Sequence, residues 1–223
     1  MRLSRRSEPF DSGDFIYELL CGVVNKAAIP LLGSPDHQRH ITPNATEELK
    51  IDGFRALAHL QDGRGELVSR NGNTFHGFTE LANWLAEHIK VESAVLDGEI
   101  ACVAGSGRPV FRDLLFRKGQ CIFIAFDLLY LNGKDLRVRP LLERKALLKK
   151  LLRRKRARVL YLDHVEADGC LLFEQVVKMD LEGIVCKRKS SPYKVTEKPS
   201  PHWIKVKNRR YSQLEGREEL FER

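Results

Sequence analysis

Apolar positions recur along this chain with two different periods, and each period predicts a different secondary structure. Apolar residues at every third or fourth position predict amphipathic helices over 78–89, 141–152 and 169–179. Alternation with a period of two, or a short run of β-branched and aromatic residues, predicts strands instead. The predicted strands are 15–20, 50–60, 66–69, 94–103, 121–129, 159–162, 183–187 and 203–207.

Local signals indicate how these segments connect. The Asp62-Gly63 pair predicts a hairpin turn between two strands. Gly77 or Thr79 could cap the helix predicted over 78–89. Because the order mixes hairpins with inserted helices, we expect an α+β fold with largely antiparallel β-sheets flanked by helices, rather than a doubly wound sheet.

The remaining segments show little periodicity. Residues 1–14 are polar and expected to be poorly ordered, and the prolines within 21–44 favour a loop. The length suits one large domain, so we expect a single domain over 1–223 with 209–223 as a C-terminal tail.

Composition and charge restrict the class of protein. Apolar residues make up 43% of the chain, which suits a globular core rather than disorder. Lysine and arginine exceed aspartate and glutamate by eight (38 − 30), a balance that favours polyanionic partners. No segment resembles an export signal, and the most apolar run, 121–131, is too short to span a bilayer, so no membrane partner is expected.

The five cysteines are well separated in the sequence. They are Cys21, Cys102, Cys121, Cys170 and Cys186. No CxxC pair occurs, so a zinc site is not indicated. Several of them lie inside apolar runs, where we expect buried free thiols, and this usage fits a reducing cytoplasm.

Six short motifs follow one another in an order that could build a nucleotide site. They are Lys50-Ile51-Asp52-Gly53-Phe54-Arg55, Ser69-Arg70-Asn71-Gly72, Leu96-Asp97-Gly98-Glu99, Phe126-Asp127, Glu182-Gly183-Ile184-Val185 and Trp203-Ile204-Lys205-Val206-Lys207. A lysine amine becomes a useful nucleophile when its surroundings disfavour the charged form. Lys205 and Lys207 alternate along a predicted strand, so both could act beside Lys50 and hold an α-phosphate.

Other residues in these motifs offer metal ligands and a stacking surface. Glu99 and Glu182 are candidate oxygen ligands for Mg²⁺, which commonly binds one or two carboxylates plus substrate phosphate. Phe126 offers a face for a base. Taken singly, each motif has an ordinary structural explanation, because Asp-Gly pairs are commonly turns and Phe126 or Trp203 could simply pack. The functional hypothesis therefore depends on all six motifs occurring together.

Together the motifs resemble those of the covalent nucleotidyltransferases, which include ATP-dependent DNA ligases, RNA ligases and mRNA-capping guanylyltransferases. The sequence is most similar to the adenylation domain of bacterial ATP-dependent DNA ligases of the end-joining type. The resemblance implies the nucleotidyltransferase (ATP-grasp-like) fold, ATP and Mg²⁺ or Mn²⁺ as cofactors, and nicked or broken double-stranded DNA as substrate. It also implies a role in DNA repair and recombination in the bacterial cytoplasm, associated with the nucleoid.

The resemblance further implies the chemistry of individual residues. Lys50 would attack the ATP α-phosphate to form lysyl-AMP, and the AMP would pass to a DNA 5′-phosphate before the 3′-hydroxyl displaces it. The other implied roles are adenine contact for Glu48, ribose and phosphate contact for Arg55 and Arg70, ribose contact and metal binding for Glu99, stacking on the two faces of adenine for Phe126 and Val185, metal binding for Glu182, and α-phosphate contact for Lys205 and Lys207.

Two features depart from the family pattern. A Tyr-Glu-Leu strand normally runs straight into the nucleophilic lysine, but here Tyr17-Glu18-Leu19 lies far upstream of Lys50. Residues 20–49 therefore resemble an insertion, and either Glu18 or Glu48 could contact adenine; Glu48 keeps the local spacing. We also expect no OB-fold domain, so activity could need a separate OB-fold or end-binding protein.

The basic stretch after residue 142 and the overall function each have more than one explanation. The stretch 143–158 carries nine lysines and arginines, which could contact a DNA backbone or form a solvated helix face. As to function, a noncatalytic module that binds nucleotide or DNA ends is an alternative to a ligase-type enzyme. Among enzymes, an RNA ligase or a guanylyltransferase is a further alternative.

Overall fold

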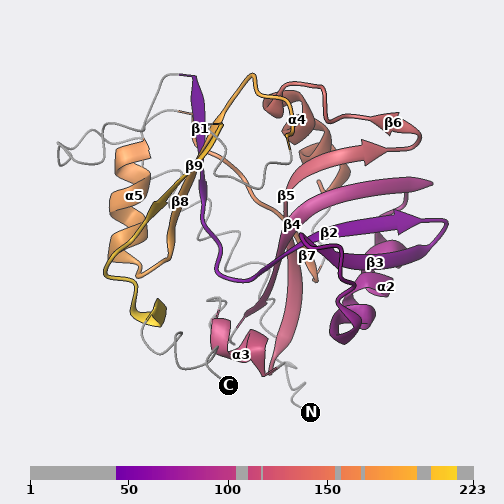
Figure 1. Cartoon of the computed structure of the whole chain (residues 1–223), viewed down its shortest axis with the longest axis horizontal. Helices are drawn as coiled ribbons and strands as arrows, with labels where there is room; N and C mark the ends of the chain where they lie inside the picture. The colour runs from indigo at the N-terminus through magenta and orange to yellow at the C-terminus, as the bar shows by residue number, and fades with distance from the viewer. Residues whose placement is uncertain are drawn as a thin grey trace, which may run out of the picture.

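In the computed structural model of this protein, the described residues are 44–103, 110–116, 118–153, 157–166, 169–194 and 202–214. They form two β-sheets flanked by helices (Figure 1). The larger sheet contains β2 (Phe54–Gln61), β3 (Arg64–Ser69), β4 (Ser93–Val103), β5 (Gln120–Leu131), β6 (Lys134–Asp135) and β7 (Val159–Tyr161). The smaller sheet contains β1 (Ala45–Leu49), β8 (Gly183–Arg188) and β9 (Trp203–Lys207). The helices are α2 (Thr79–His88), α3 (Phe111–Leu115), α4 (Leu141–Leu151) and α5 (Gly169–Lys178), with 3-10 turns η2 (His76–Phe78) and η3 (Ser212–Leu214).

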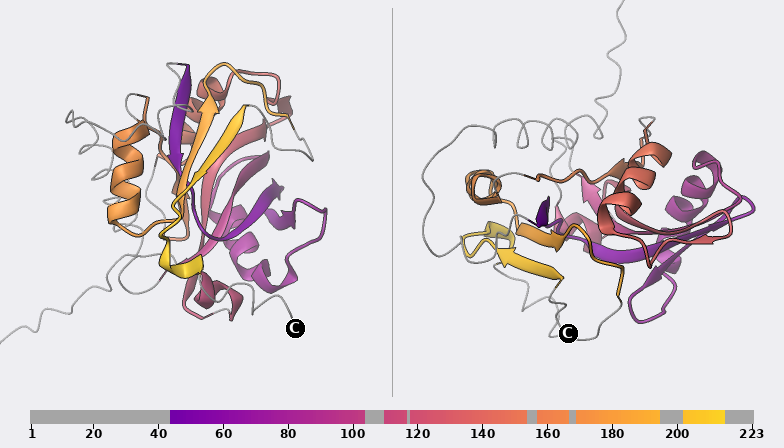
Figure 2. Two further views of the ribbon diagram at one scale, coloured as in Figure 1. Left: turned by 60° about the vertical axis from the view of Figure 1, so that its left-hand side comes forward. Right: turned by 90° about the horizontal axis from the view of Figure 1, so that it is seen from above.

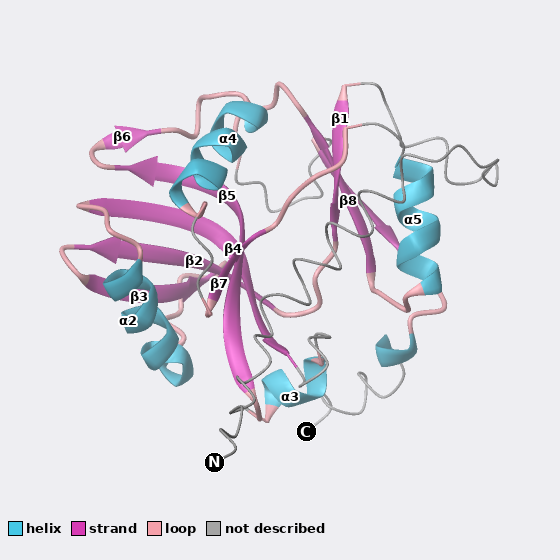
Figure 3. Cartoon of the chain, turned by 180° about the vertical axis from the view of Figure 1, so that it is seen from behind, coloured by secondary structure: helices cyan, strands magenta, loops and turns pink. Residues whose placement is uncertain are grey.

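Strand pairing is antiparallel within both sheets, except that β7 runs parallel to β5. The strand orders are β3-β2-β4-β5-β6 in the larger sheet and β1-β8-β9 in the smaller one. Helices α2 and α4 cover one face of the larger sheet (Figure 3), and α5 lies beside the smaller sheet, away from the larger one (Figure 2). The prediction of an α+β fold with largely antiparallel sheets is confirmed.

Strand β5 is buried on both faces and contributes to two apolar cores. Phe123 and Ala125 belong to the core under α2 and α4, whereas Ile122, Ile124 and Phe126 belong to a second core that also contains residues of α5 and the smaller sheet. Because successive side chains of a strand point to opposite faces, one continuous apolar run can supply both cores. The buried strand predicted over 121–129 is therefore confirmed.

The hairpin predicted at Asp62-Gly63 is also confirmed. Both residues have positive φ, 49° and 74°, which is the conformation of the tight turn that matches strand twist. The turn brings Gln61 opposite Arg64 and sets the β2–β3 register.

The strand predicted over 50–60 is wrong in its first part. Strand β1 ends at Leu49 in the smaller sheet and β2 begins at Phe54 in the larger sheet, so residues 50–53 form a link between the sheets. Lys50 and Asp52 consequently do not share a strand face. Alternating polarity cannot reveal such a link, because it carries no information on which sheet a residue joins.

The caps predicted for the helix over 78–89, which is α2, are wrong. The N-cap of α2 is Phe78, which makes no side-chain capping bond, while the Thr79 hydroxyl donates to the carbonyl of His76 at 2.8 Å. The 3-10 turn η2 runs directly into the helix, so the cap position falls on an aromatic residue that packs edge to face with Phe54.

The solvated face considered for the basic stretch 143–158 is contradicted at two positions of α4. Arg144 is fully buried and donates to both carboxylate oxygens of Asp127 at 2.8 Å. Lys145 is also buried, and its ammonium donates to the carbonyl of Leu162 at 2.9 Å. Lys149 and Lys150 are exposed, as predicted.

The prediction of free thiols is wrong for two cysteines. Cys102 and Cys121 face each other across β4 and β5, with Cα atoms 4.2 Å apart, and form a disulfide. This spacing is that of a directly opposed, closely spaced antiparallel pair. Cys170 and Cys186 are free, and Cys21 lies outside the described residues.

Some predictions concern residues that the structure does not describe. The strand over 15–20, all but one residue of the loop over 21–44, and the last nine residues of the tail, 215–223, lie outside the described ranges. Within the described ranges, no helix is long and apolar enough to cross a membrane.

We predict that Arg144→Met lowers the free energy of unfolding by about 3–5 kcal/mol, because Asp127 would stay buried without its counter-charge. Arg137→Met is the matched control, since Arg137 pairs with the exposed Asp135 and should shift the urea midpoint little. Urea denaturation followed by circular dichroism measures both. Equal midpoints for the two variants would contradict a structural role for the buried pair.

Candidate active site

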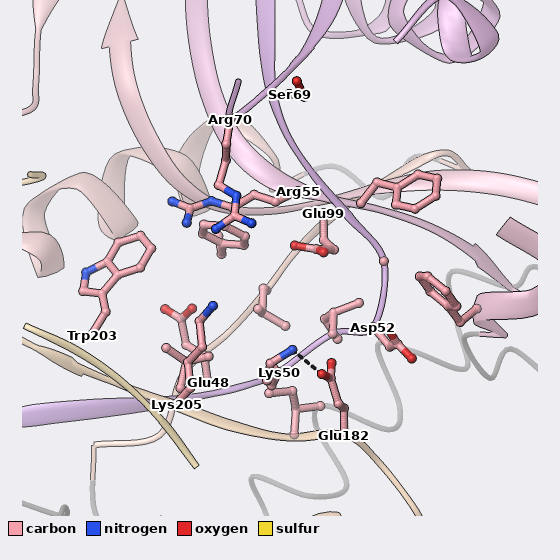
Figure 4. Close-up of a pocket in the computed structure, with 18 of the residues that line it drawn as sticks. Glu48, Lys50, Asp52, Arg55, Ser69, Arg70, Glu99, Glu182, Trp203 and Lys205 are labelled. Carbon is pink, nitrogen blue, oxygen red and sulfur yellow. Dashed lines mark ion pairs between the residues drawn. The ribbon is translucent and has the colours of Figure 1, made fainter. Parts of the chain in front are cut away.

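A cavity of about 680 Å³ lies between the two sheets. Its lining includes every residue proposed for the site except Lys207, namely Glu48, Lys50, Arg55, Arg70, Glu99, Phe126, Glu182, Val185 and Lys205. Figure 4 shows Arg55, Arg70 and Glu99 entering from the side of the larger sheet, opposite Lys50, Glu182 and Lys205. A volume of this size is typical of sites that enclose a small molecule or cofactor.

The Lys50 ammonium lies at the junction of the two sheets. Its Nζ is 2.5 Å from Oε1 of Glu182, whose side chain is only 5% exposed. The backbone holds this pair together, because the Lys50 amide donates to the carbonyl of Gly183 at 2.9 Å. Gly183 is required there, since a Cβ on it would lie 2.2 Å from the carbonyl oxygen of Val206. The close packing of β8 against β9 therefore holds the Glu182 carboxylate beside the Lys50 amine.

Glu99 and Glu182 are the carboxylates that could hold a cation in the cavity. Within the described part of the chain, the buried Oε2 of Glu182 has no hydrogen-bond partner, so one hard oxygen donor is left available. Burial raises the pKa of Glu99 to about 8, despite the opposing charges of Lys50 and Arg55. The described residues contain no cluster of three or more His, Cys, Asp or Glu side chains placed for a metal. A Mg²⁺ ion would fit only with phosphate oxygens and water as further ligands, which is its usual coordination.

Arg55 is held rigidly in the cavity wall by Asp97. Its Nε and Nη2 donate to the two carboxylate oxygens of Asp97 at 3.1 and 2.6 Å, and the Tyr193 hydroxyl donates to the same carboxylate at 2.9 Å. Asp97 is fully buried, so its charge is compensated by this pair. The guanidinium is therefore oriented before any ligand arrives.

Glu48 lies at the back of the cavity between two lysines. Lys187 donates to its Oε2 at 2.5 Å, and the Lys145 ammonium forms an ion pair with its Oε1 at 2.7 Å. Burial favours the neutral acid, yet the two cations hold the pKa of Glu48 below its ordinary value. Burial also lowers the pKa of Lys145. Glu48 is thus an ionised, fixed hydrogen-bond acceptor.

An aromatic wall adjoins Glu48. Phe126 and Trp203 pack edge to face with centroids 6.0 Å apart, and the Lys187 ammonium lies 4.3 Å from each ring centre. The Arg55 guanidinium also faces both rings, at 5.6 and 5.1 Å. Val185 lines the same region. The wall combines apolar surface with positive charge, which suits a planar base attached to phosphates.

The two lysines of β9 are placed differently. Lys205 points into the cavity (Figure 4), where partial burial and the neighbouring charges of Lys50, Arg55 and Arg70 lower its pKa. Lys207 lies opposite Gly183 at the end of the sheet and does not line the cavity. Two residues of a strand span about 7 Å, enough to carry the second lysine past the cavity edge.

Four residues of this region were missed in the sequence: Asp97, Lys145, Lys187 and Tyr193. A signal existed for Lys187, because it follows Val185 by two positions and so shares its strand face. Asp97 sits beside Glu99 in the same motif. Lys145 looked like part of a basic surface, and Tyr193 lies in a segment without periodicity. Glu18, the alternative to Glu48, lies outside the described residues.

Comparison with known proteins gives a consistent result. The family model "ATP dependent DNA ligase domain" matches residues 35–207. The chain is 34% identical over 169 residues to the multifunctional non-homologous end joining protein LigD of Pseudomonas aeruginosa, covering 72% of this chain and 20% of that protein. It is 31% identical over 189 residues to the bifunctional LigD of Bacillus subtilis, covering 72% of this chain and 31% of that protein.

Solved structures are similar as well. The structure described as mycobacterial DNA ligase D complexed with ATP and MES superposes with a TM-score of 0.64 at 30% identity, covering 74% of this chain and 54% of that one. The ligase domain of LigD from M. tuberculosis gives a TM-score of 0.62 at 31% identity, covering 73% of this chain and 53% of that one. The chain therefore spans less than two thirds of the length of these relatives.

We predict that Glu99→Gln stabilises the protein at high pH but not at low pH. The folded pKa of about 8 exceeds the ordinary 4.5, so from about pH 4.5 to 8 the folded state keeps a proton that the unfolded chain releases. Wild-type stability should fall relative to Glu99→Gln across this window, on the order of a few kcal/mol, and the difference should level off above it.

Urea denaturation over about pH 4 to 9 in a metal-free buffer measures this difference. Glu92→Gln, at an exposed position just before β4, is the control and should follow the wild type. A constant difference between Glu99→Gln and wild type at every pH would show that Glu99 does not titrate in this window.

Proposed function

The chain belongs to the family of ATP-dependent DNA ligase domains, and we propose that it is a DNA ligase-type adenylyltransferase whose nucleophile is the Nζ atom of Lys50. The observation that carries the proposal is the Lys50 ammonium, fixed between two sheets at 2.5 Å from a buried carboxylate and surrounded by further cations. The positive charges of such a cavity complement the phosphate groups of a nucleotide.

In the first step, Lys50 Nζ attacks the α-phosphorus of ATP. A nitrogen–phosphorus bond forms, the bond from that phosphorus to the pyrophosphate oxygen breaks, and pyrophosphate leaves. The amine must give up a proton, and the nearest base is Oε1 of Glu182. Catalysis of phosphoryl transfer depends mainly on positioning and electrostatic stabilisation, which the fixed Lys50–Glu182 pair provides.

The remaining lining residues would hold the nucleotide. Glu48, kept ionised by two lysines, would accept a hydrogen bond from the amino edge of adenine. Phe126 and Val185 would contact the faces of the base. Arg70 and Lys205 would bind phosphate oxygens, and Arg55, already oriented by Asp97, would bind ribose or phosphate.

Mg²⁺ or Mn²⁺ would be held by Glu182 and Glu99, whose oxygens fit a hard cation. When bound, such an ion neutralises phosphate oxygens and so assists the departure of pyrophosphate. The orphaned Oε2 of Glu182 supports this assignment.

In the later steps, AMP would pass from Lys50 to a DNA 5′-phosphate at a nick, and a 3′-hydroxyl would displace it. Relatives of this chain are described as non-homologous end joining proteins, which supports a role in DNA repair. The exposed Lys149, Lys150 and Arg153 on and after α4 are candidates for DNA backbone contact. We further propose a cytoplasmic protein that acts with an OB-fold or end-binding partner.

We predict that wild-type protein incubated with Mg²⁺ and ATP radiolabelled at the α-phosphate forms a covalent adduct that survives a denaturing gel. Lys50→Ala should abolish the band, because no other group would carry the AMP. Lys150→Ala, an exposed lysine on α4, is the matched control and should label like the wild type. Labelling that persists in Lys50→Ala would refute the assignment of the nucleophile.

Labelled GTP in the same assay distinguishes a guanylyltransferase. A well-folded wild type that gives no band with either nucleotide, even with an OB-fold protein supplied, would favour a noncatalytic binding module.

A second prediction compares the two lysines of β9. Lys205→Ala should reduce the rate of adduct formation at least about tenfold, because one phosphate-binding donor inside the cavity is lost. Lys207→Ala should stay within about twofold of wild type, since its side chain does not line the cavity. Initial rates at saturating ATP measure both, and equal losses in the two variants would contradict the placement of Lys207.

A further inference from the structure

The segment that follows β9 contacts two separate parts of the site. Residues 208–212, here called the clamp segment, follow β9, the last strand of the smaller sheet. One set of contacts reaches the turn before β8, and the Tyr211 side chain reaches the link that carries Lys50. These contacts have no role in the chemistry described above.

The first set of contacts holds the Glu182 turn. The Asn208 amide donates to the carbonyl of Glu182 at 2.9 Å, and its side-chain amide donates to the carbonyl of Leu181 at 3.0 Å. The Ser212 amide and hydroxyl donate to the two carboxylate oxygens of Asp180 at 2.8 and 2.5 Å. The backbone on both sides of Glu182 is therefore tied to the clamp segment.

The second contact holds the Lys50 link. The Tyr211 hydroxyl donates to Oδ2 of Asp52 at 3.0 Å, and both side chains are buried. Asp52 is two residues from Lys50, with no strand ladder between them. Because the peptide backbone has only two soft torsions per residue, fixing Asp52 limits the backbone positions open to Lys50, from which the amine extends.

We propose that Tyr211 is a positioning residue for the Lys50 nucleophile, acting through Asp52, and that the clamp segment sets the Lys50–Glu182 geometry. This inference rests on the proposed adenylyltransferase function. Tyr211 does not line the cavity, so its loss should disturb the reacting geometry rather than the contacts to nucleotide. A displacement of about 1 Å at a reacting group can cost on the order of a hundredfold in rate.

Single-turnover adduct formation at varied ATP concentration tests the inference. Tyr211→Phe keeps the ring in the core and removes only the hydroxyl. The maximal rate of Tyr211→Phe should fall about tenfold, while its half-saturating ATP concentration stays within about twofold of wild type. A loss of rate without a loss of ATP affinity indicates that the nucleophile is no longer well positioned. Tyr130→Phe, on β5 outside the cavity, is the matched control and should behave as wild type.

A double-mutant cycle separates positioning from general destabilisation. If Tyr211 acts through Asp52, then Tyr211→Phe should add little to the rate loss of Asp52→Ala. Additive losses, or a rise in half-saturating ATP equal to the fall in rate, would overturn the inference. Urea midpoints show whether each variant is folded under the assay conditions.

The two proposals fail in different ways. A wild type that forms no adduct overturns the adenylyltransferase function and this inference with it. A wild type that labels on Lys50, with an unchanged rate in Tyr211→Phe, overturns the inference alone.

Discussion

The rest of the structure depends on one short crossing, in which residues 50–53 carry the chain from the smaller sheet to the larger one. The crossing is fixed at both ends: the Lys50 amide bonds to Gly183 in one sheet, and Gly53 passes so close to β4 that a Cβ would lie 2.2 Å from the carbonyl oxygen of Ile100. Lys50 therefore stands where both sheets contribute polar groups.

Charge is buried around this crossing in pairs, and the pairs connect the two sheets. Arg144 binds Asp127 on β5 in the larger sheet, while its neighbour Lys145 binds Glu48 on β1 in the smaller sheet. One turn of α4 thus holds an acid from each sheet. Buried ion pairs add little net stability over well-packed apolar residues, because desolvation offsets the attraction. What they provide here is a defined distance between the sheets, and with it a defined cavity.

The strongly periodic elements could be predicted from the sequence, because their signal comes from local burial. Helix α5 and strand β5 follow directly from apolar spacing, and the Asp62-Gly63 hairpin from turn chemistry. The crossing could not, because a change of sheet leaves no periodic trace. The burial of Arg144 and Lys145 depends on acids far away in the sequence, so helical spacing alone placed them in solvent. Lys207 was assigned with Lys205 because alternation gives a shared face, but it cannot show where a cavity ends.

These ties bear on whether the domain reacts or only binds. A module that only binds a nucleotide needs the residues that line the cavity. Binding tolerates small movements of one cavity wall relative to the other. Chemistry at phosphorus needs more, because attack requires the nucleophile to lie about 3–3.5 Å from the phosphorus and roughly in line with the leaving oxygen. The shared core of β5, the two buried ion pairs on α4 and the clamp segment all fix the two walls, and Tyr211 of the clamp segment does so without lining the cavity. That much positioning around one lysine favours catalysis over simple binding.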